Sequence, residues 1–128
     1  MRIPPGFNTV TPYLFVDRAD QLLTFLVHGL GGTELLRHMN GDRIANAQVV
    51  IGTSTVMVSE ASTAFPAMPG SYYIYVENAD ESMSRAIAAG ADKIIDVSDM
   101  PYQDRQGGVR DPCGNIWWIS QRLIDGPY

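Results

Sequence analysis

Side chains that could perform nucleophilic or metal chemistry are few in this sequence, and they stand apart from one another. His28 falls near the end of a predicted helix and His38 at the end of a predicted strand, so each is interpreted as a surface or hydrogen-bonded histidine. Cys113 lies inside the turn Asp111-Pro-Cys-Gly114 and has no matched histidine, so we expect no nucleophilic role for it. The remaining chemistry must come from aromatic and polar side chains.

The tyrosines are concentrated in a segment that occurs twice. Tyr13-Leu-Phe-Val-Asp-Arg-Ala-Asp20 returns sixty residues later as Tyr73-Ile-Tyr-Val-Glu-Asn-Ala-Asp80, with Tyr, Val, Ala and Asp identical. Each copy runs into an amphipathic stretch that ends in glycine and a short apolar run, over residues 30–35 and 89–94. A duplicated unit predicts paired modules that share one core, with a site where the modules meet.

Hydrophobic periodicity predicts the same element order, β-α-β-β-β, in both copies. In the first, residues 9–16 form a strand, Leu22, Leu23, Leu26 and Val27 form the apolar face of a helix, and strands follow at 34–38, 44–51 and 54–59. Residues 61–70, with two prolines, are interpreted as a linker. In the second copy, strands are predicted at 72–76, 93–97, 108–110 and 115–120, with a polar loop at 99–108. A helix is predicted at 79–89, with Met83, Ala86 and Ile87 facing inward.

These elements predict a single α+β domain, residues 1–128, made of modules 9–60 and 71–122. The 128 residues suffice for one compact core, and the net charge of −5 argues against a nucleic-acid partner. A single cysteine excludes an internal disulfide and favours a reducing compartment. No apolar run approaches membrane-spanning length, so we expect no membrane partner and a cytoplasmic location.

Three stretches of the chain resemble the vicinal oxygen chelate superfamily, which includes glyoxalase I, extradiol dioxygenases and bleomycin-resistance proteins. They are Thr11-Pro-Tyr-Leu-Phe-Val16, Ala45-Asn-Ala-Gln-Val-Val-Ile-Gly52, and Tyr102-Gln-Asp-Arg105 with Gly108-Val-Arg-Asp-Pro-Cys-Gly-Asn-Ile-Trp-Trp118. The resemblance implies two modules that close a curved mixed sheet around a cavity, commonly in a homodimer. Where the related branch shows histidine before alanine, this chain has Asn46.

The resemblance also implies where a metal would bind: on the first and last strands of each module. The matching positions are Thr11, Met57, Ser71 and Trp118, none of which is a plausible ligand for zinc, nickel or iron. We therefore expect no metal and no other cofactor. The glyoxalase and extradiol dioxygenase activities, which need a metal, are argued against by these residues.

Strand alternation converts the resemblance into a list of residues that face the cavity. The predicted ligand-binding residues are Thr11, Tyr13, Phe15, Asn46, Gln48, Met57, Ser71, Tyr73, Tyr75 and Trp118, with Arg105 at the cavity mouth and Ser59 and Ser120 beside them. Alternation turns Glu60 away, so it is not expected to act as a base. Two alternatives stay open: the aromatic rings fill the cavity themselves, and Asp104 and Arg105 form only a local ion pair.

The sequence therefore predicts a metal-free protein that binds a flat or aromatic small molecule in a cup between the modules, as bleomycin-resistance proteins do. The first alternative is a metal-independent lyase or isomerase that uses a tyrosine, Asp104 or Arg105. A second is a partner or regulatory module. A homodimer is expected because open sheet edges are usually paired or covered, and the apolar segment Ile3-Pro-Pro-Gly-Phe7 could contact a neighbouring copy.

Overall fold

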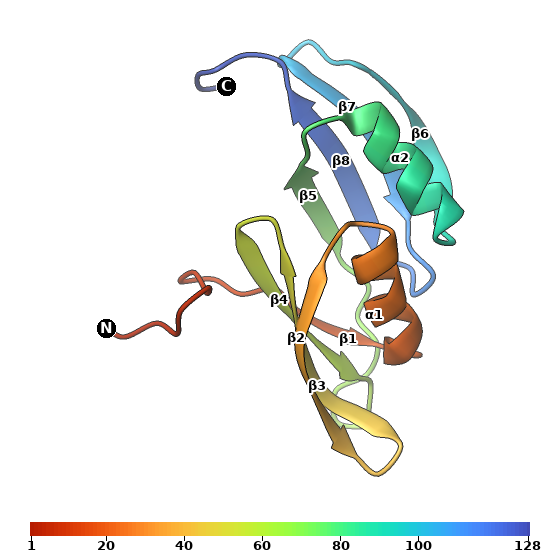
Figure 1. Ribbon diagram of the computed structural model, residues 1–128. Coiled ribbons are helices and arrows are strands. Elements are labelled where there is room, and N and C mark those ends of the chain that lie inside the picture. Colours follow the sequence, from red (N-terminus) through yellow and green to blue (C-terminus); the bar gives the residue numbers. More distant parts are fainter.

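The computed structural model describes residues 1–128 as two similar modules joined by a linker (Figure 1). The first contains β1 (Tyr13–Val16), α1 (Ala19–His28), β2 (Thr33–Asn40), β3 (Arg43–Ile51) and β4 (Ser54–Glu60). The second contains β5 (Ser71–Tyr75), α2 (Ala79–Ala88), β6 (Asp92–Asp99), β7 (Asp104–Arg110) and β8 (Ile116–Arg122). The predicted β-α-β-β-β order and the α+β class are confirmed.

Each module forms its own four-stranded mixed sheet, with the orders β1-β4-β3-β2 and β5-β8-β7-β6. The first strand pairs in parallel with the last, which places Tyr13 opposite Met57 and Tyr73 opposite Trp118. The predicted single curved sheet around a cavity is not formed, because no strand pairing joins β1 to β5. Along β1 the linker is hydrogen-bonded instead, through the Met68 amide and the Phe15 carbonyl at 2.9 Å.

The duplication extends to the way each helix begins. Arg18 precedes α1 with a positive φ of 64° and no side-chain cap of its own. Its amide and that of Ala19 donate to the carboxylate of Glu60, at the end of β4, over 3.0 and 2.9 Å. Gln121 of β8 accepts from the amide of Ala79 at the start of α2 in the same way, at 3.0 Å. Glu60 is therefore occupied as a helix cap, which satisfies otherwise unpaired amides.

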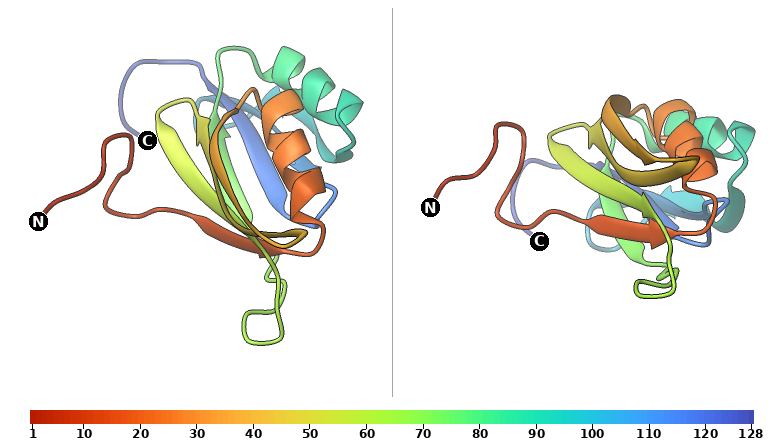
Figure 2. Two further views of the ribbon diagram at one scale, coloured as in Figure 1. Left: turned by 60° about the horizontal axis from the view of Figure 1, so that its bottom comes forward. Right: turned by 90° about the horizontal axis from the view of Figure 1, so that it is seen from below.

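One hydrophobic core spans both modules. It contains 18 buried residues, including Leu26 of α1 and Trp117 of β8. Both helices lie on the same side of the sheets, and the segments before β1 and after β8 lie on the other side (Figure 2). Across the helix junction, Arg85 donates to the carbonyl of His28 at 2.9 Å. Neither ten-residue helix has the length and apolar character needed to cross a lipid bilayer.

Three local expectations differ from the structure. Ile87 was expected to face inward, but it is 41% exposed, because it lies over the outer strand β6 beside Lys93 and Val97. Helix α1 buries Phe25 as well as its three leucines, while Val27 is half-buried. The predicted loop 99–108 is mostly strand, since β6 reaches Asp99 and β7 starts at Asp104.

Candidate ligand-binding site

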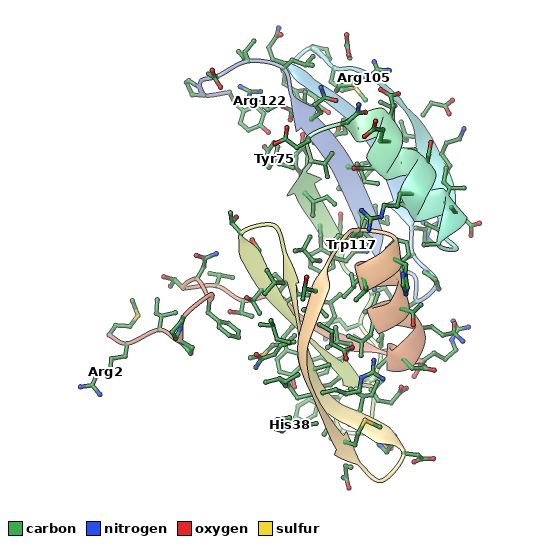
Figure 3. All side chains as sticks on the ribbon, in the orientation of Figure 1. Arg2, His38, Tyr75, Arg105, Trp117 and Arg122 are labelled. Atoms are coloured by element: carbon green, nitrogen blue, oxygen red, sulfur yellow. The ribbon has the colours of Figure 1, made fainter.

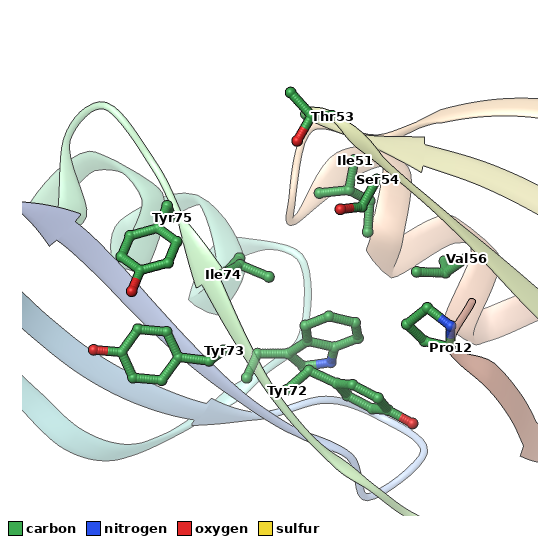
Figure 4. A pocket seen from close by; sticks show the side chains of 11 residues that line it. Pro12, Ile51, Thr53, Ser54, Val56, Tyr72, Tyr73, Ile74 and Tyr75 are labelled. Carbon is green, nitrogen blue, oxygen red and sulfur yellow. The ribbon is translucent and has the colours of Figure 1, made fainter. Parts of the chain in front are cut away.

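The sheet faces opposite the helices are open and carry the aromatic residues that alternation predicted. Along β1, Leu14 and Val16 are each 1% exposed on the helix side, whereas Tyr13 is 44% exposed. On β5, Tyr72 and Ile74 point toward the first module and the rings of Tyr73 and Tyr75 point the other way (Figure 4). The predicted parity of both first strands is therefore confirmed.

The open face of the first module is an aromatic stack with a polar floor. Tyr13 stacks on Phe15 with ring centroids 4.7 Å apart, and Phe65 of the linker stacks on Phe15 at 5.6 Å. The Tyr13 hydroxyl is hydrogen-bonded to Ser59 at 2.7 Å and accepts from the Asn46 amide at 3.2 Å. These rings line one hollow of the module.

Thr11, Gln48 and Met57 line a second hollow on the first module, which is bordered by residues of the segment 1–9. This segment is fixed to β4 by the Thr55 hydroxyl, which donates to the Gly6 carbonyl at 2.6 Å. Beyond this contact the segment runs outward from the sheets, with residues 3–6 exposed (Figure 2).

The open face of the second module is built around a buried carboxylate. Asp104 is 0% exposed, accepts from Arg122 at 3.0 Å and from Tyr128 at 2.8 Å, and also accepts from the hydroxyl of Tyr73. Desolvation disfavours its charge, but the three donors outweigh desolvation and hold the pKa of Asp104 below its usual value. Burial and the bond to Asp104 raise the pKa of Tyr73, so this phenol stays protonated.

Trp118 lies on this same open face, as predicted. Its indole N–H donates to the hydroxyl of Ser71 at 2.9 Å, and its ring covers Gly108 of β7, where a Cβ atom would lie 2.9 Å from the ring. Trp117 points the other way: it is 2% exposed, and its indole donates to Asp111 at 2.8 Å. The parity of β8 is therefore the one that the sequence predicted.

The four positions that the resemblance implies for a metal do not form a ligand set. Ser71 and Trp118 are hydrogen-bonded to each other, and an indole N–H has no lone pair to donate to a metal. The other two positions offer a threonine hydroxyl and a methionine thioether, Thr11 and Met57. Elsewhere in the chain no three histidine, cysteine or acidic side chains come together. The residues present do not fit the metal that the fold implies.

Arg105 does not belong to the open face, contrary to the prediction. It binds Asp80 of α2 at 2.8 Å and Asp99 at 3.0 Å, on the side of α2, whereas Arg122 lies on the side of Tyr75 (Figure 3). These carboxylates raise the pKa of Arg105 further above its ordinary value. The local pair between Asp104 and Arg105 is also not formed, because adjacent residues of a strand point to opposite faces.

The sequence reasoning missed two residues of the second face, Arg122 and Tyr128, and it considered Asp104 only as a possible catalytic residue or as one half of a local ion pair. Asp104 alternates with Gln106, whose amide donates to Ser120 at 2.8 Å, so a strand assignment for residues 104–110 would have placed both on the open face. The polar composition of this stretch concealed the strand. Nothing in the sequence pattern indicates that Tyr128 folds back onto β7.

The two open faces do not share a hollow within one chain. Tyr13 and Phe15 line one on the first module, and Tyr73 and Tyr75 line another on the second. The hollow between the modules has about 260 Å³ and lies at the free edge of β5, between Ile74 and the β3–β4 turn (Figure 4). Of the residues predicted for a cup between the modules, Tyr73 and Tyr75 line this hollow, whereas Tyr13 and Phe15 line a separate one.

The two histidines and the cysteine belong to no group of three histidine, cysteine or acidic side chains that could hold a metal ion. His28 and His38 are both exposed. Cys113 is half-buried, its thiol lies 3.3 Å from the Asp17 carbonyl, and burial with the nearby Asp111 raises its pKa to about 11. A thiol with this pKa is a poor nucleophile at neutral pH.

Comparison with known proteins finds matches in sequence and in structure. No protein-family model matches the chain. The protein Mb0911c of Mycobacterium bovis is 28% identical over 124 residues, covering 88% of this chain and 82% of that protein. TioX from Micromonospora sp. ML1 has a similar structure, with a TM-score of 0.74, 27% identity, and 94% and 100% of the two chains covered.

Two further solved structures have the same architecture at lower identity. TnmS3, an antibiotic binding protein from Streptomyces sp. CB03234, matches with a TM-score of 0.73 and 18% identity over 95% of this chain and 98% of its own. A glyoxalase/bleomycin resistance protein/dioxygenase superfamily member from Sphaerobacter thermophilus matches with a TM-score of 0.68 and 18% identity. The match covers 90% of this chain and 98% of that one. The protein thus has the fold of the glyoxalase/bleomycin resistance protein/dioxygenase superfamily, as the sequence resemblance to vicinal oxygen chelate proteins predicted.

Proposed function

We propose that the protein binds a flat aromatic small molecule by stacking on the open sheet faces, without a metal. The observation that carries the proposal is the set of aromatic side chains left uncovered on these faces: Tyr13, Tyr73 and Tyr75 are 44%, 43% and 55% exposed. Aromatic rings with polar ends at hand suit recognition by stacking together with a few hydrogen bonds. The similarity to TnmS3, an antibiotic binding protein, supports this class of function.

We further propose that the binding unit is a homodimer in which each copy covers the open faces of the other. The faces are separate within one chain, and large exposed aromatic surfaces mark interaction sites. The outer edge of β5 is also free, because β5 pairs only with β8. A second copy would enclose a ligand that a single open face leaves in contact with water.

The alternative, a metal-independent lyase or isomerase, lacks a base suited to proton transfer. Asp104 is the one buried carboxylate of the open faces, and its three donors keep its pKa low and its oxygens occupied. A general base works best with a pKa near the operating pH. The arrangement therefore favours binding over catalysis.

Calorimetric titration with acridine, a flat tricyclic probe, in mildly alkaline buffer tests the proposal. Wild type should bind, and Trp118→Ala should weaken binding by roughly 1–3 kcal/mol if the indole provides stacking. Trp117→Phe is the matched control, because Trp117 is buried on the helix side and should leave the affinity unchanged. Equal affinity of wild type and Trp118→Ala would count against stacking on this face. Mass spectrometry of molecules that co-purify with the protein would identify the natural ligand.

A further inference from the structure

Tyr128 folds back over the open face of the second module and occupies it. Arg122 fixes the preceding backbone by donating to the carbonyls of Gly126 at 3.0 Å and Pro127 at 2.8 Å. The same guanidinium lies 4.5 Å from the centroid of the Tyr128 ring, a cation–π geometry. The Tyr128 hydroxyl donates to Asp104 at 2.8 Å and is hydrogen-bonded to Tyr75. A phenol is therefore bound by its ring and by its hydroxyl.

The charges around Asp104 select which group can take this position. The carboxylate charge is already matched by Arg122, which contacts the other carboxylate oxygen at 3.0 Å. A cationic ligand would be repelled by the guanidinium, and an anionic one by the carboxylate. A neutral hydroxyl on an aromatic ring satisfies both groups, since it donates to Asp104 while its ring faces Arg122. This is the chemistry that Tyr128 already presents.

The first module has an equivalent ring without the polar partner. Phe65 follows β4 as Tyr128 follows β8, and it stacks on Phe15, the counterpart of Tyr75 in the repeat. Both rings remain largely exposed to solvent, Phe65 at 61% and Tyr128 at 74%. Each open face is thus contacted at one place by an aromatic ring from the segment after its last strand. Only the ring on the second face, that of Tyr128, carries a hydroxyl that can bind the face below it.

We propose that Asp104, Tyr73 and Arg122 form a phenol-binding subsite, and that Tyr128 occupies it as an internal substitute that the ligand displaces. This inference rests on the proposed function, because it identifies the hydroxylated end of an aromatic ligand and the face that receives it. The free-energy cost of displacing Tyr128 should be small. The ligand replaces each contact of Tyr128 with one of the same kind, and the Tyr128 ring buries little surface.

The test removes the internal phenol and supplies it as a separate molecule. Tyr128→Ala should bind p-cresol, the tyrosine side chain as a free compound, at least about tenfold more tightly than wild type, as measured by NMR titration. For this variant, 4-methylanisole should bind about tenfold or more weakly than p-cresol, because the methyl ether cannot donate to a charged acceptor. The 4-methylbenzylammonium ion should gain no affinity.

Phe65→Ala provides the matched control, since it opens the other face and should not change the preference for p-cresol over 4-methylanisole. Thermal unfolding verifies that both variants are folded, which the exposure of the two rings favours. Equal binding of p-cresol by wild type and Tyr128→Ala, or equal binding of the phenol and its ether, would overturn the inference. If acridine binding still depends on Trp118 in that case, the proposed function stands and only the phenol subsite is wrong.

Discussion

Gly108 of β7 lies directly opposite Trp118 of β8, and the missing side chain of the glycine makes room for the indole ring. The neighbouring Gly107 serves the opposite face, where a Cβ atom would lie 2.3 Å from the terminal methyl group of Met83. Two consecutive glycines thus let two side chains approach the backbone of β7: Met83 of the core on one side and Trp118 of the open face on the other.

Substitutions at Gly107 and Gly108 should have different effects, one on the stability of the protein and the other on ligand binding. Gly108→Ala should tilt the half-exposed Trp118 ring and weaken acridine binding several-fold, with little change in the free energy of unfolding. Gly107→Ala should instead overpack the core at Met83 and destabilise the protein by about 1–3 kcal/mol. Calorimetric titration and urea unfolding of both variants measure the two effects. The same loss of affinity in both, without loss of stability in Gly107→Ala, would contradict the assignment of the faces.

The two capping side chains should contribute similar stability. Glu60→Ala and Gln121→Ala each leave amides at a helix start unpaired, so each should lower the free energy of unfolding by about 0.5–2 kcal/mol. Glu60→Gln should recover much of the loss because its amide oxygen can still accept. If Glu60→Ala were as stable as wild type, the capping role would be wrong.

The stability of the fold should depend on Asp104 in acid. Its pKa is lower in the folded protein than the ordinary value of 3.8, so its ionised form favours folding. This contribution is fully present above the unfolded-state pKa and is lost as the pH falls through the folded-state pKa. Wild type should therefore have a larger free energy of unfolding than Asp104→Asn at neutral pH, and this difference should disappear in strongly acidic conditions. Urea unfolding at each pH measures the difference. A difference that stays constant down to pH values below 3.8 would argue against the charged, hydrogen-bonded carboxylate.

The sequence predicted most of the fold because its signals are local. Alternation along residues 13–16 and 71–75 and the sixty-residue repeat determine the modules and the orientation of Trp118. The assembly of the site is not local. Arg105 was misplaced because its partners Asp80 and Asp99 come from α2 and β6, and the burial of Asp104 depends on Arg122 and on a residue from the end of the chain. Charged residues in a glycine-rich stretch are typical of a loop, and pairing with β6 and β8 on its two sides makes that stretch a strand.

The proposed dimerisation can be measured directly. Light scattering at micromolar concentration should give twice the chain mass of 14.1 kDa. Substituting Tyr75→Glu, at a residue 55% exposed on the second face, should shift the equilibrium toward monomer without unfolding the protein, because it places a charge in the expected interface. Glu77→Gln, an exposed residue after β5, is the control that should remain dimeric. A wild-type protein that is only monomeric would contradict the proposed dimer.

The two indole N–H groups report on the central claim, that the open face and not the helix side binds an aromatic ligand. Trp118 donates to Ser71 on the open face, and Trp117 donates to the buried Asp111. The two indole resonances in a ¹H–¹⁵N spectrum can be assigned with Trp118→Phe, because this substitution removes the resonance of Trp118 and leaves that of Trp117. On titration with acridine, the Trp118 resonance should shift progressively while that of Trp117 stays in place. A shift of Trp117 alone, or no shift of either, would contradict binding on the open face.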